Sequence, residues 1–306
     1  MFDHGLQDRA SKRSLGADRQ DSGLWMRAQG RHDKGMRMAE GKVDIDSSSD
    51  VVQMGGALLR RPVGAQGALY AGLMAGYGDA RIDSTSTLMR RDTNTAVRAK
   101  AHGKVSGYSA GVYGTFYADD VNRLGAYVDT WLQYGRYTNR LSSELGSADY
   151  DSNLWSASLE SGYALAPFAA DSPFRAWVVE PRGQLIYSRY TARAADLQDT
   201  RLRNGTADAW RSSIGVRLYQ QPGQAADESV LRPFVETNWL HSEAVPSVRM
   251  GSNSFDARPS RDALELKVGA QLRVARDVEL SSHLFGHSGS ASEYGYGGQL
   301  SLSYSW

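Results

Sequence analysis

The sequence predicts an all-β fold, a closed antiparallel β-barrel of twelve strands that spans a membrane. Three observations lead to this fold class. Apolar and polar residues alternate with a period of two along most of the chain. The composition combines 32 Gly, 16 Tyr and 7 Trp with a mean hydropathy of −0.48, as in barrels whose polar lumen dilutes their apolar outer wall. Alternating segments are joined by connections of alternating length.

The C-terminal segment shows the alternation most clearly. One face of residues 293–306 carries Tyr, Leu and Trp side chains, whereas the other carries mainly Gly, Gln and Ser. This segment is longer than most soluble strands and is close to the length that a tilted membrane strand needs. An even number of strands suits a closed barrel without an exposed edge. We predict strands near 22–33, 50–61, 67–81, 104–118, 124–138, 152–166, 174–189, 208–220, 231–241, 261–274, 277–287 and 293–306.

The second face of these strands favours a membrane barrel over a soluble β-sandwich, which stays as the alternative fold. A sandwich usually exposes a charged face, whereas the second face here is rich in Gly, Ser and Gln. Small uncharged residues with a few charges suit a crowded polar lumen. Tyr304 and Trp306 at one end of the last strand, with Tyr294 and Tyr296 at the other, resemble the aromatic girdles of membrane barrels.

The predicted connections between strands favour one orientation. Short periplasmic turns opposite long extracellular loops are typical of outer-membrane barrels. An even strand count then places both ends of the barrel on the periplasmic side. The short connections lie near 62–66, 119–123 and 275–276, the intermediate ones near 167–173 and 221–230, and the long ones near 34–49, 82–103, 139–151, 190–207 and 242–260.

Two prolines lie inside predicted strands. Pro181 and Pro233 lack the backbone N–H that a central ladder needs. We therefore predict a bulge or a local end of pairing at each of them.

Composition argues against several classes of function. The 35 Lys and Arg nearly balance the 34 Asp and Glu, which argues against a nucleic-acid binder driven by positive charge. The chain has no Cys, which excludes disulfides, Cys zinc sites and thiol nucleophiles. His283 and His287 would lie roughly 13 Å apart on one strand and cannot share a metal. The aspartates of residues 44–50 lack the EF-hand spacing. We expect no metal and no cofactor.

Residues 1–21 do not alternate, and we predict them as a unit separate from a barrel of residues 22–306. They carry no continuous apolar stripe and no apolar core of a signal peptide, so we expect the chain to be a fragment of a longer precursor. Two interpretations stay open. One is a disordered tail, and the other is a polar helix in the lumen, where about twenty residues would span roughly 30 Å.

Short motifs along the whole chain carry a family resemblance. They lie at 11–15 (SKRSL), 23–27 (GLWMR), 73–77 (LMAGY), 125–134 (GAYVDTWLQY), 159–163 (LESGY), 179–185 (VEPRGQL), 232–240 (RPFVETNWL) and 303–306 (SYSW). Taken in order, they resemble the C-terminal translocator domain of classical (type Va) autotransporters, nearest the Bordetella pertactin and serum-resistance group.

The resemblance implies a twelve-stranded transmembrane barrel with an N-terminal α-helix in its lumen, which secretes an N-terminal passenger and anchors it at the bacterial cell surface. It implies an outer-membrane location with a periplasmic C-terminus. The implied partners are outer-membrane lipids, the passenger, the barrel-assembly machinery and periplasmic chaperones, without nucleic acid. We expect a monomer. Tyr304 and Trp306 resemble a barrel-assembly signal.

Charged residues on the predicted inner face need partners of opposite charge. We expect a ladder of Arg–carboxylate pairs that braces the wall and holds the helix. Lys12, Arg13 and Arg19 of the helix would face carboxylates, and the aspartates of residues 8–21 would face Arg. The predicted pore-lining residues are Arg27, Asp129, Glu160, Glu180, Arg182, Arg211, Arg217, Glu236, Glu265, Lys267 and Glu279.

Self-cleavage inside the pore is the one catalytic activity that the resemblance suggests, since some relatives cut the passenger there. Asn cyclisation needs an Asn in the helix, and the first Asn is Asn94. A carboxylate pair such as Asp129 with Glu160 could act if burial raised one pKa. Two other functions stay open. They are a porin-like channel with an open lumen, and a barrel hydrolase, for which no Ser–His–Asp spacing stands out.

Overall fold

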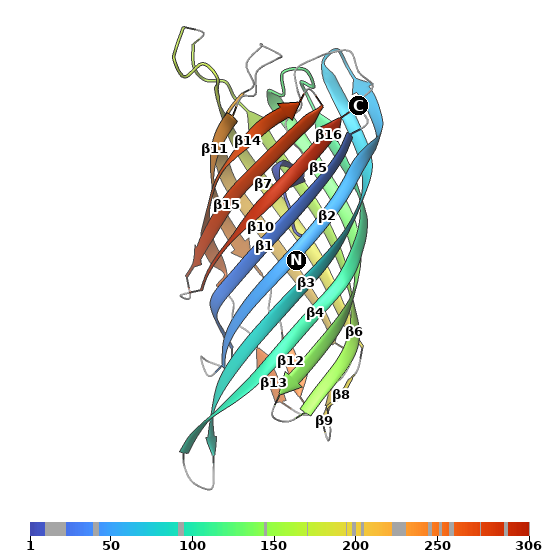
Figure 1. The fold of residues 1–306 in the computed structure, drawn as a ribbon, viewed down its shortest axis with the longest axis vertical. Coiled ribbons are helices and arrows are strands. Elements are labelled where there is room, and N and C mark those ends of the chain that lie inside the picture. The colour runs from blue at the N-terminus through green and yellow to red at the C-terminus, as the bar shows by residue number, and fades with distance from the viewer. Residues whose placement is uncertain are drawn as a thin grey trace.

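A twelve-stranded barrel closes around a short N-terminal segment in the computed structural model (Figure 1). The strand order around the barrel is β1-β16-β15-β14-β11-β10-β7-β6-β5-β4-β3-β2, and every pair is antiparallel. The structure describes residues 1–9, 23–38, 43–90, 95–143, 146–169, 171–193, 195–197, 200–202, 205–221, 231–243, 247–250, 253–256, 260–275, 277–290 and 293–305.

The barrel strands confirm the predicted fold class. They are β1 (Gly23–Met38), β2 (Val43–Val63), β3 (Gly67–Arg90), β4 (Thr95–Tyr117), β5 (Gly125–Ser143), β6 (Gly146–Ala164), β7 (Trp177–Ala192), β10 (Gly205–Gln220), β11 (Leu231–Ser242), β14 (Asp262–Ala275), β15 (Val278–Gly289) and β16 (Tyr294–Ser305). A separate sheet contains β8 (Ala195–Leu197), β9 (Thr200–Leu202), β12 (Ser247–Met250) and β13 (Asn253–Asp256).

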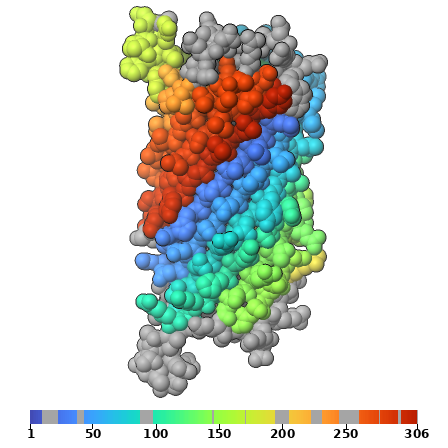
Figure 2. Space-filling view, in the orientation of Figure 1, coloured from blue at the N-terminus to red at the C-terminus, as the bar shows by residue number. Residues whose placement is uncertain are grey.

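The barrel closes where its first strand meets its last. Gly23 lies opposite Ser305 and Lys34 lies opposite Tyr294, so β1 and β16 pair along most of their length. Figure 2 shows this seam, with the red C-terminal strands directly beside the blue N-terminal ones and all of them tilted across the surface. Closure leaves no barrel edge free for pairing with another chain.

Alternate residues point into the lumen and toward the membrane, as the sequence predicts. In β5, the side chain of Trp131 is 2% exposed and that of the neighbouring Leu132 is 45% exposed. Tyr294, Tyr296 and Tyr304 all lie on the exposed face of β16. The large apolar side chains on the outside are therefore the lipid-facing wall.

The strands at one end of the barrel run further than predicted. β3 and β4 contain 24 and 23 residues, and most of 82–103, which was expected to be a loop, belongs to them. The apolar alternation ends where the wall leaves the hydrocarbon layer, but backbone pairing continues beyond it, as between Asp83 and His102. We call this the long-hairpin end. The opposite end, with the β2–β3 and β4–β5 turns, is the short-turn end.

Each proline lies at a local break or end of one backbone ladder. The ladder from β7 to β6 is interrupted after Arg182, next to Pro181, and resumes as a single bridge between Val179 and Leu165, while the ladder to β10 continues in register. Pro233 is the third residue of β11, and pairing with β10 stops at Phe234. The missing N–H of proline accounts for both features.

Residues 1–9, which we call the plug, lie within the barrel and contain the helix α1 (Leu6–Arg9) (Figure 1). The described part of this helix contains four residues, and residues 1–5, which the prediction placed in the helix, are not helical. The Asp8 carboxylate accepts the Gly5 N–H at 2.9 Å and so caps this turn. The predicted helix residues Lys12, Arg13 and Arg19 lie outside the described residues. Among the described residues, no helix has the length and hydropathy to cross a membrane.

Candidate functional site

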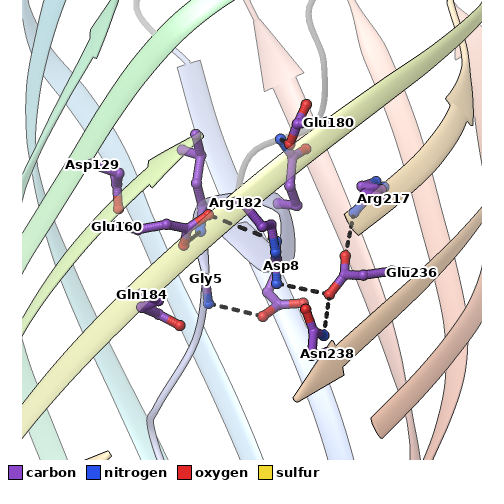
Figure 3. Close-up of polar contacts among 12 residues, drawn as sticks. Gly5, Asp8, Asp129, Glu160, Glu180, Arg182, Gln184, Arg217, Glu236 and Asn238 are labelled. Carbon is purple, nitrogen blue, oxygen red and sulfur yellow. Dashed lines mark hydrogen bonds and ion pairs between the residues drawn. The ribbon is translucent and has the colours of Figure 1, made fainter. Parts of the chain in front are cut away.

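An acidic stripe on one side of the lumen holds α1. Asp129 of β5 lies directly opposite Glu160 of β6, and Glu180 of β7 completes the stripe. The Leu6 N–H donates to Glu160 at 2.9 Å, the Gln7 amide donates to Glu180 at 3.0 Å, and Arg9 pairs with Asp129. Figure 3 shows the three carboxylates around the helix. A carboxylate at the first N–H of a helix also matches the helix dipole.

The acidic stripe is buried, and each of its carboxylates has partners on the wall. The Tyr127 hydroxyl donates to Glu160 at 3.0 Å, and the Thr115 hydroxyl donates to Asp129. The Arg9 guanidinium, paired with Asp129, lies 4.1 Å from the centre of the Tyr113 ring. These contacts offset the cost of burying the charges.

A second cluster on the other side of α1 contains five of the predicted pore-lining residues. Arg182 pairs with Glu236 at 2.7 Å and Arg217 approaches the same carboxylate at 3.4 Å (Figure 3). Lys267 lies 3.5 Å from Asp8 of the plug, 3.6 Å from Glu236 and 3.7 Å from Glu265. Arg182 also reaches Glu160 at 3.7 Å, so it joins this cluster to the acidic stripe.

Uncharged side chains that the sequence reasoning did not single out hold the backbone of the plug. The Gln184 amide and the Trp131 indole N–H both donate to the His4 carbonyl, at 2.8 and 3.1 Å. The Gln299 amide donates to the Asp8 carbonyl at 2.8 Å. Alternation places these residues on the inner face. The sequence reasoning searched for charged residues with charged partners. It did not single out these uncharged side chains, because their partners are backbone carbonyls.

Arg27 differs from its expected role. Its guanidinium donates to the Gln53 and Gln299 side-chain oxygens at 2.9 and 3.2 Å, and to the Phe2 carbonyl at 3.3 Å. No carboxylate pairs with Arg27 within the described ranges, so the prediction of an Arg–carboxylate ladder is wrong at this position. Gln29 adds another oxygen at 3.1 Å. Amide oxygens and a backbone carbonyl replace the expected carboxylate.

Two further predicted residues lie away from the central clusters. Arg211 pairs with Asp3 of the plug, nearer the long-hairpin end. Glu279 pairs with Arg232 of β11 at 2.8 Å. The sequence places both side chains on the inner face, but their height in the barrel follows from the register between strands.

His283 and His287 lie beside different carboxylates. His283 lies 3.9 Å from Asp8 of the plug, and His287 lies 3.3 Å from Asp33. Within the described ranges, no three His, Asp or Glu side chains are grouped to hold a metal ion.

The fold, with its lumen occupied by the N-terminal segment, defines the class, a translocator barrel of the outer membrane. Residues 24–283 match the Autotransporter beta-domain family, and the chain belongs to this family. It is 29% identical over 318 residues to the uncharacterized protein YdeU of Escherichia coli (strain K12). That alignment covers 100% of this chain and 66% of YdeU. The chain therefore has the secretion function of an autotransporter translocator domain.

Solved structures agree on the fold. The transport unit of the autotransporter AIDA-I from Escherichia coli superposes with a TM-score of 0.81 at 23% identity, covering 96% of this chain and 93% of that one. The beta domain of the Bordetella autotransporter BrkA superposes with a TM-score of 0.68 at 18% identity, covering 92% and 98%. The chain spans 24% of the length of the whole AIDA-I adhesin.

Proposed function

We propose that the barrel carries a passenger, joined through residues 1–21, to the cell surface and anchors it there with this segment in the pore. The observation that carries the proposal is the position of the plug. The nine-residue plug makes polar contacts with nine strands of the wall, β1, β4, β5, β6, β7, β10, β14, β15 and β16. A segment held in this way can transmit the load of an attached domain to the barrel.

The wall suits a polypeptide of any sequence. Gln184, Trp131, Gln299 and Arg27 all donate to backbone carbonyls. Every passing residue offers a carbonyl acceptor, so these donors can bind successive parts of a passenger. We assign them the role of guiding the backbone, and we assign the charged clusters the role of holding the final segment.

The direction of the plug supports the proposed orientation. A Cβ on Gly78 of β3 would meet Met1 and Phe2, whereas Arg9 lies over Tyr113, which is paired with Gly72 nearer the short-turn end. The chain before Met1 would therefore leave through the long-hairpin end. We propose that this end is extracellular and that the C-terminus is periplasmic.

Asp129 and Glu160 are better suited to binding the plug than to cleaving it. They face each other in register, as self-cleavage would need. Each is nevertheless engaged, Asp129 by Arg9 and Thr115 and Glu160 by the Leu6 N–H and Tyr127. We assign both carboxylates to anchoring and propose no enzyme activity.

Single-channel conductance in planar bilayers tests the anchoring segment. We expect a low conductance for the full chain and a higher one after deletion of residues 1–21, because the plug and its contacts then leave the lumen. The variant Asp149→Asn, on an exposed ion pair of the outer wall, is the matched control and should conduct like the full chain. High conductance before and after the deletion would support the porin-like alternative.

We propose that a monomer inserts among outer-membrane lipids with the help of periplasmic chaperones and the barrel-assembly machinery, which would read the C-terminal aromatic residues. Tyr304 is exposed on the outer wall, and Trp306 lies outside the described residues. Tyr304→Ala should lower the amount of folded barrel in outer membranes, and Tyr294→Ala, at the other end of the same strand, is the control. Equal amounts for both variants would remove the assembly role from Tyr304.

A further inference from the structure

The turn that joins β4 to β5, residues 118–124, has a rigid internal structure. The Asp119 carboxylate accepts the N–H groups of Val121 and Asn122 at 3.1 and 2.9 Å, and the Asp119 carbonyl accepts the Arg123 N–H at 3.1 Å. Arg123 has a φ of 55°, which a residue with a Cβ rarely adopts. The surrounding contacts therefore fix this turn in a conformation that its sequence alone does not favour.

Asp120 fastens the turn to β2 and β3. Its side chain is 6% exposed and pairs with Arg60 of β2 at 2.7 Å and with Arg123 at 3.0 Å. The hydroxyl of Tyr70 of β3 donates to the same carboxylate at 2.8 Å. The Asp120 N–H also donates to the Gln66 carbonyl of the β2–β3 turn at 2.8 Å.

The far side of the turn is fastened to the opposite wall. The Gln221 amide, directly after β10, donates to the Asn122 carbonyl at 3.0 Å. In the closed strand order, β10 lies six places from β2 in either direction. The contacts from Arg60 through the turn to Gln221 thus link opposite sides of the barrel at the short-turn end, the upper end in Figure 1.

The turn and the plug are two separate layers. A cavity of about 130 Å³ lies between Arg123 and Leu124 of the turn and Leu6 and Gln7 of α1. Side chains on its wall come from Tyr70, Tyr113, Tyr117 and Tyr127. The Arg123 guanidinium stacks over the Tyr117 ring, 3.7 Å from its centre, and so extends from the turn into the lumen.

We propose that the β4–β5 turn is a second closure of the pore, which narrows the short-turn mouth independently of the plug. The closed position is set by the Asp120 cluster on one side and by the Gln221–Asn122 hydrogen bond on the other. That a polypeptide enters by this mouth rests on the function proposed above, whereas the closure itself does not. A passing chain would break the Gln221 contact, which is exposed, before the buried Asp120 cluster.

Thiol labelling of the full chain in detergent tests the closure, because the natural sequence has no Cys. Ser303→Cys places a thiol in the cavity between turn and plug, and Ala65→Cys places one on the exposed β2–β3 turn. We expect a charged maleimide to label Ser303→Cys more slowly than Ala65→Cys. Adding Gln221→Ala should speed labelling at Ser303→Cys about five-fold, as expected for loss of one hydrogen bond, and leave Ala65→Cys unchanged.

The neighbouring residue provides the matched control. Gln220→Ala removes the same type of side chain from the preceding position, whose side chain makes no hydrogen bond with the turn in the described part of the chain, and should leave both rates unchanged. Equal rates for Gln221→Ala and Gln220→Ala, or fast labelling of Ser303→Cys from the start, would overturn the closure. Neither result depends on whether deletion of residues 1–21 changes conductance, so a failure of the closure and a failure of the plug are distinguishable.

Discussion

At the scale of single residues, buried ion pairs between the wall and the plug hold the plug in the lumen. Removing one partner of such a pair is destabilising because the other charge stays buried without a counter-charge. Arg9 and Asp129 are both almost fully buried. Asp129→Asn leaves the Arg9 guanidinium buried without its counter-charge, and we expect a loss of about 3 kcal/mol of stability together with a raised conductance. The urea midpoint of unfolding in detergent measures the first effect.

The exposed pair Arg140–Asp149, with side chains 65% and 61% exposed, gives the control for this prediction. Asp149→Asn should change stability by less than about 0.5 kcal/mol, because water screens that pair. If the two variants unfolded at the same urea concentration, the Arg9–Asp129 pair would have no special role in holding the plug.

Asp120, in the β4–β5 turn outside the membrane-spanning wall, should make the stability of the barrel depend on pH. Burial raises the pKa of the Asp120 carboxyl. Arg123, Arg60 and the Tyr70 hydroxyl together lower this pKa by more than burial raises it, so the pKa lies below its ordinary value. A lowered pKa in the folded state contributes stability above the unfolded pKa of about 3.9, and this stability is lost as pH falls through the folded value. We expect the urea midpoint to fall on acidification from pH 6 to pH 3. At pH 6 the urea midpoint of Asp120→Asn should be lower than that of the natural chain, and it should fall less between pH 6 and pH 3. If the two plots of midpoint against pH ran parallel, Asp120 would not account for the pH dependence.

The sequence predicted which residues lie on the inner face of each strand, but not their positions along the barrel axis. Alternation placed Asp129, Glu160 and Lys267 on the inner face, where the structure has them. Their pairing follows from strand register, which sets Asp129 opposite Glu160 and which single-strand patterns do not encode. Gln184 and Trp131 were not singled out because backbone carbonyls are their partners.

At the scale of elements, glycines let large aromatic side chains lie flat on the inner wall. A Cβ at Gly107 of β4 would lie 2.2 Å from the Arg136 carbonyl oxygen and 2.7 Å from the Tyr137 ring. Backbone atoms cannot move aside cheaply, so we expect Gly107→Ala to cost about 1–3 kcal/mol. Folded and unfolded fractions can be separated by the heat-dependent migration of the barrel in gels, read across a urea series.

Gly114 on the same strand is the matched control, because a Cβ there would meet its nearest neighbours at 3.7 and 3.8 Å, an ordinary contact. Gly114→Ala should leave stability within about 0.5 kcal/mol of the natural chain. Equal losses at Gly107 and Gly114 would mean that strand flexibility, and not the close approach of the Tyr137 ring, accounts for the effect.

Element boundaries were predictable only within the membrane. There the lipid selects apolar residues at every second position, so the twelve strands could be counted from sequence. Beyond it, hairpins such as β3–β4 continue in water, where pairing depends on backbone hydrogen bonds and leaves little hydrophobic pattern. The four-residue helix α1 is set by its Asp8 cap and by Glu160, and thus by tertiary contacts.

At the scale of the whole molecule, the barrel is asymmetric along its axis. The long-hairpin end extends the wall by strands such as β3 and β4, whereas the short-turn end is bridged from β2 to the end of β10 by the β4–β5 turn. The plug runs between the two with its N-terminus toward the long hairpins. These three features agree with transport in one direction, from the bridged mouth toward the hairpins.

Labelling of single cysteines on intact cells tests this orientation. Ser142→Cys lies near the end of β5 on the long hairpins, and Ala65→Cys lies on the β2–β3 turn, both exposed. An impermeant maleimide should label Ser142→Cys on intact cells and Ala65→Cys only after the outer membrane is permeabilised, since the natural chain contributes no thiol. The reverse pattern would place the C-terminus outside the cell. The plug would then point its N-terminus into the periplasm, and a passenger joined there would have no path to the surface.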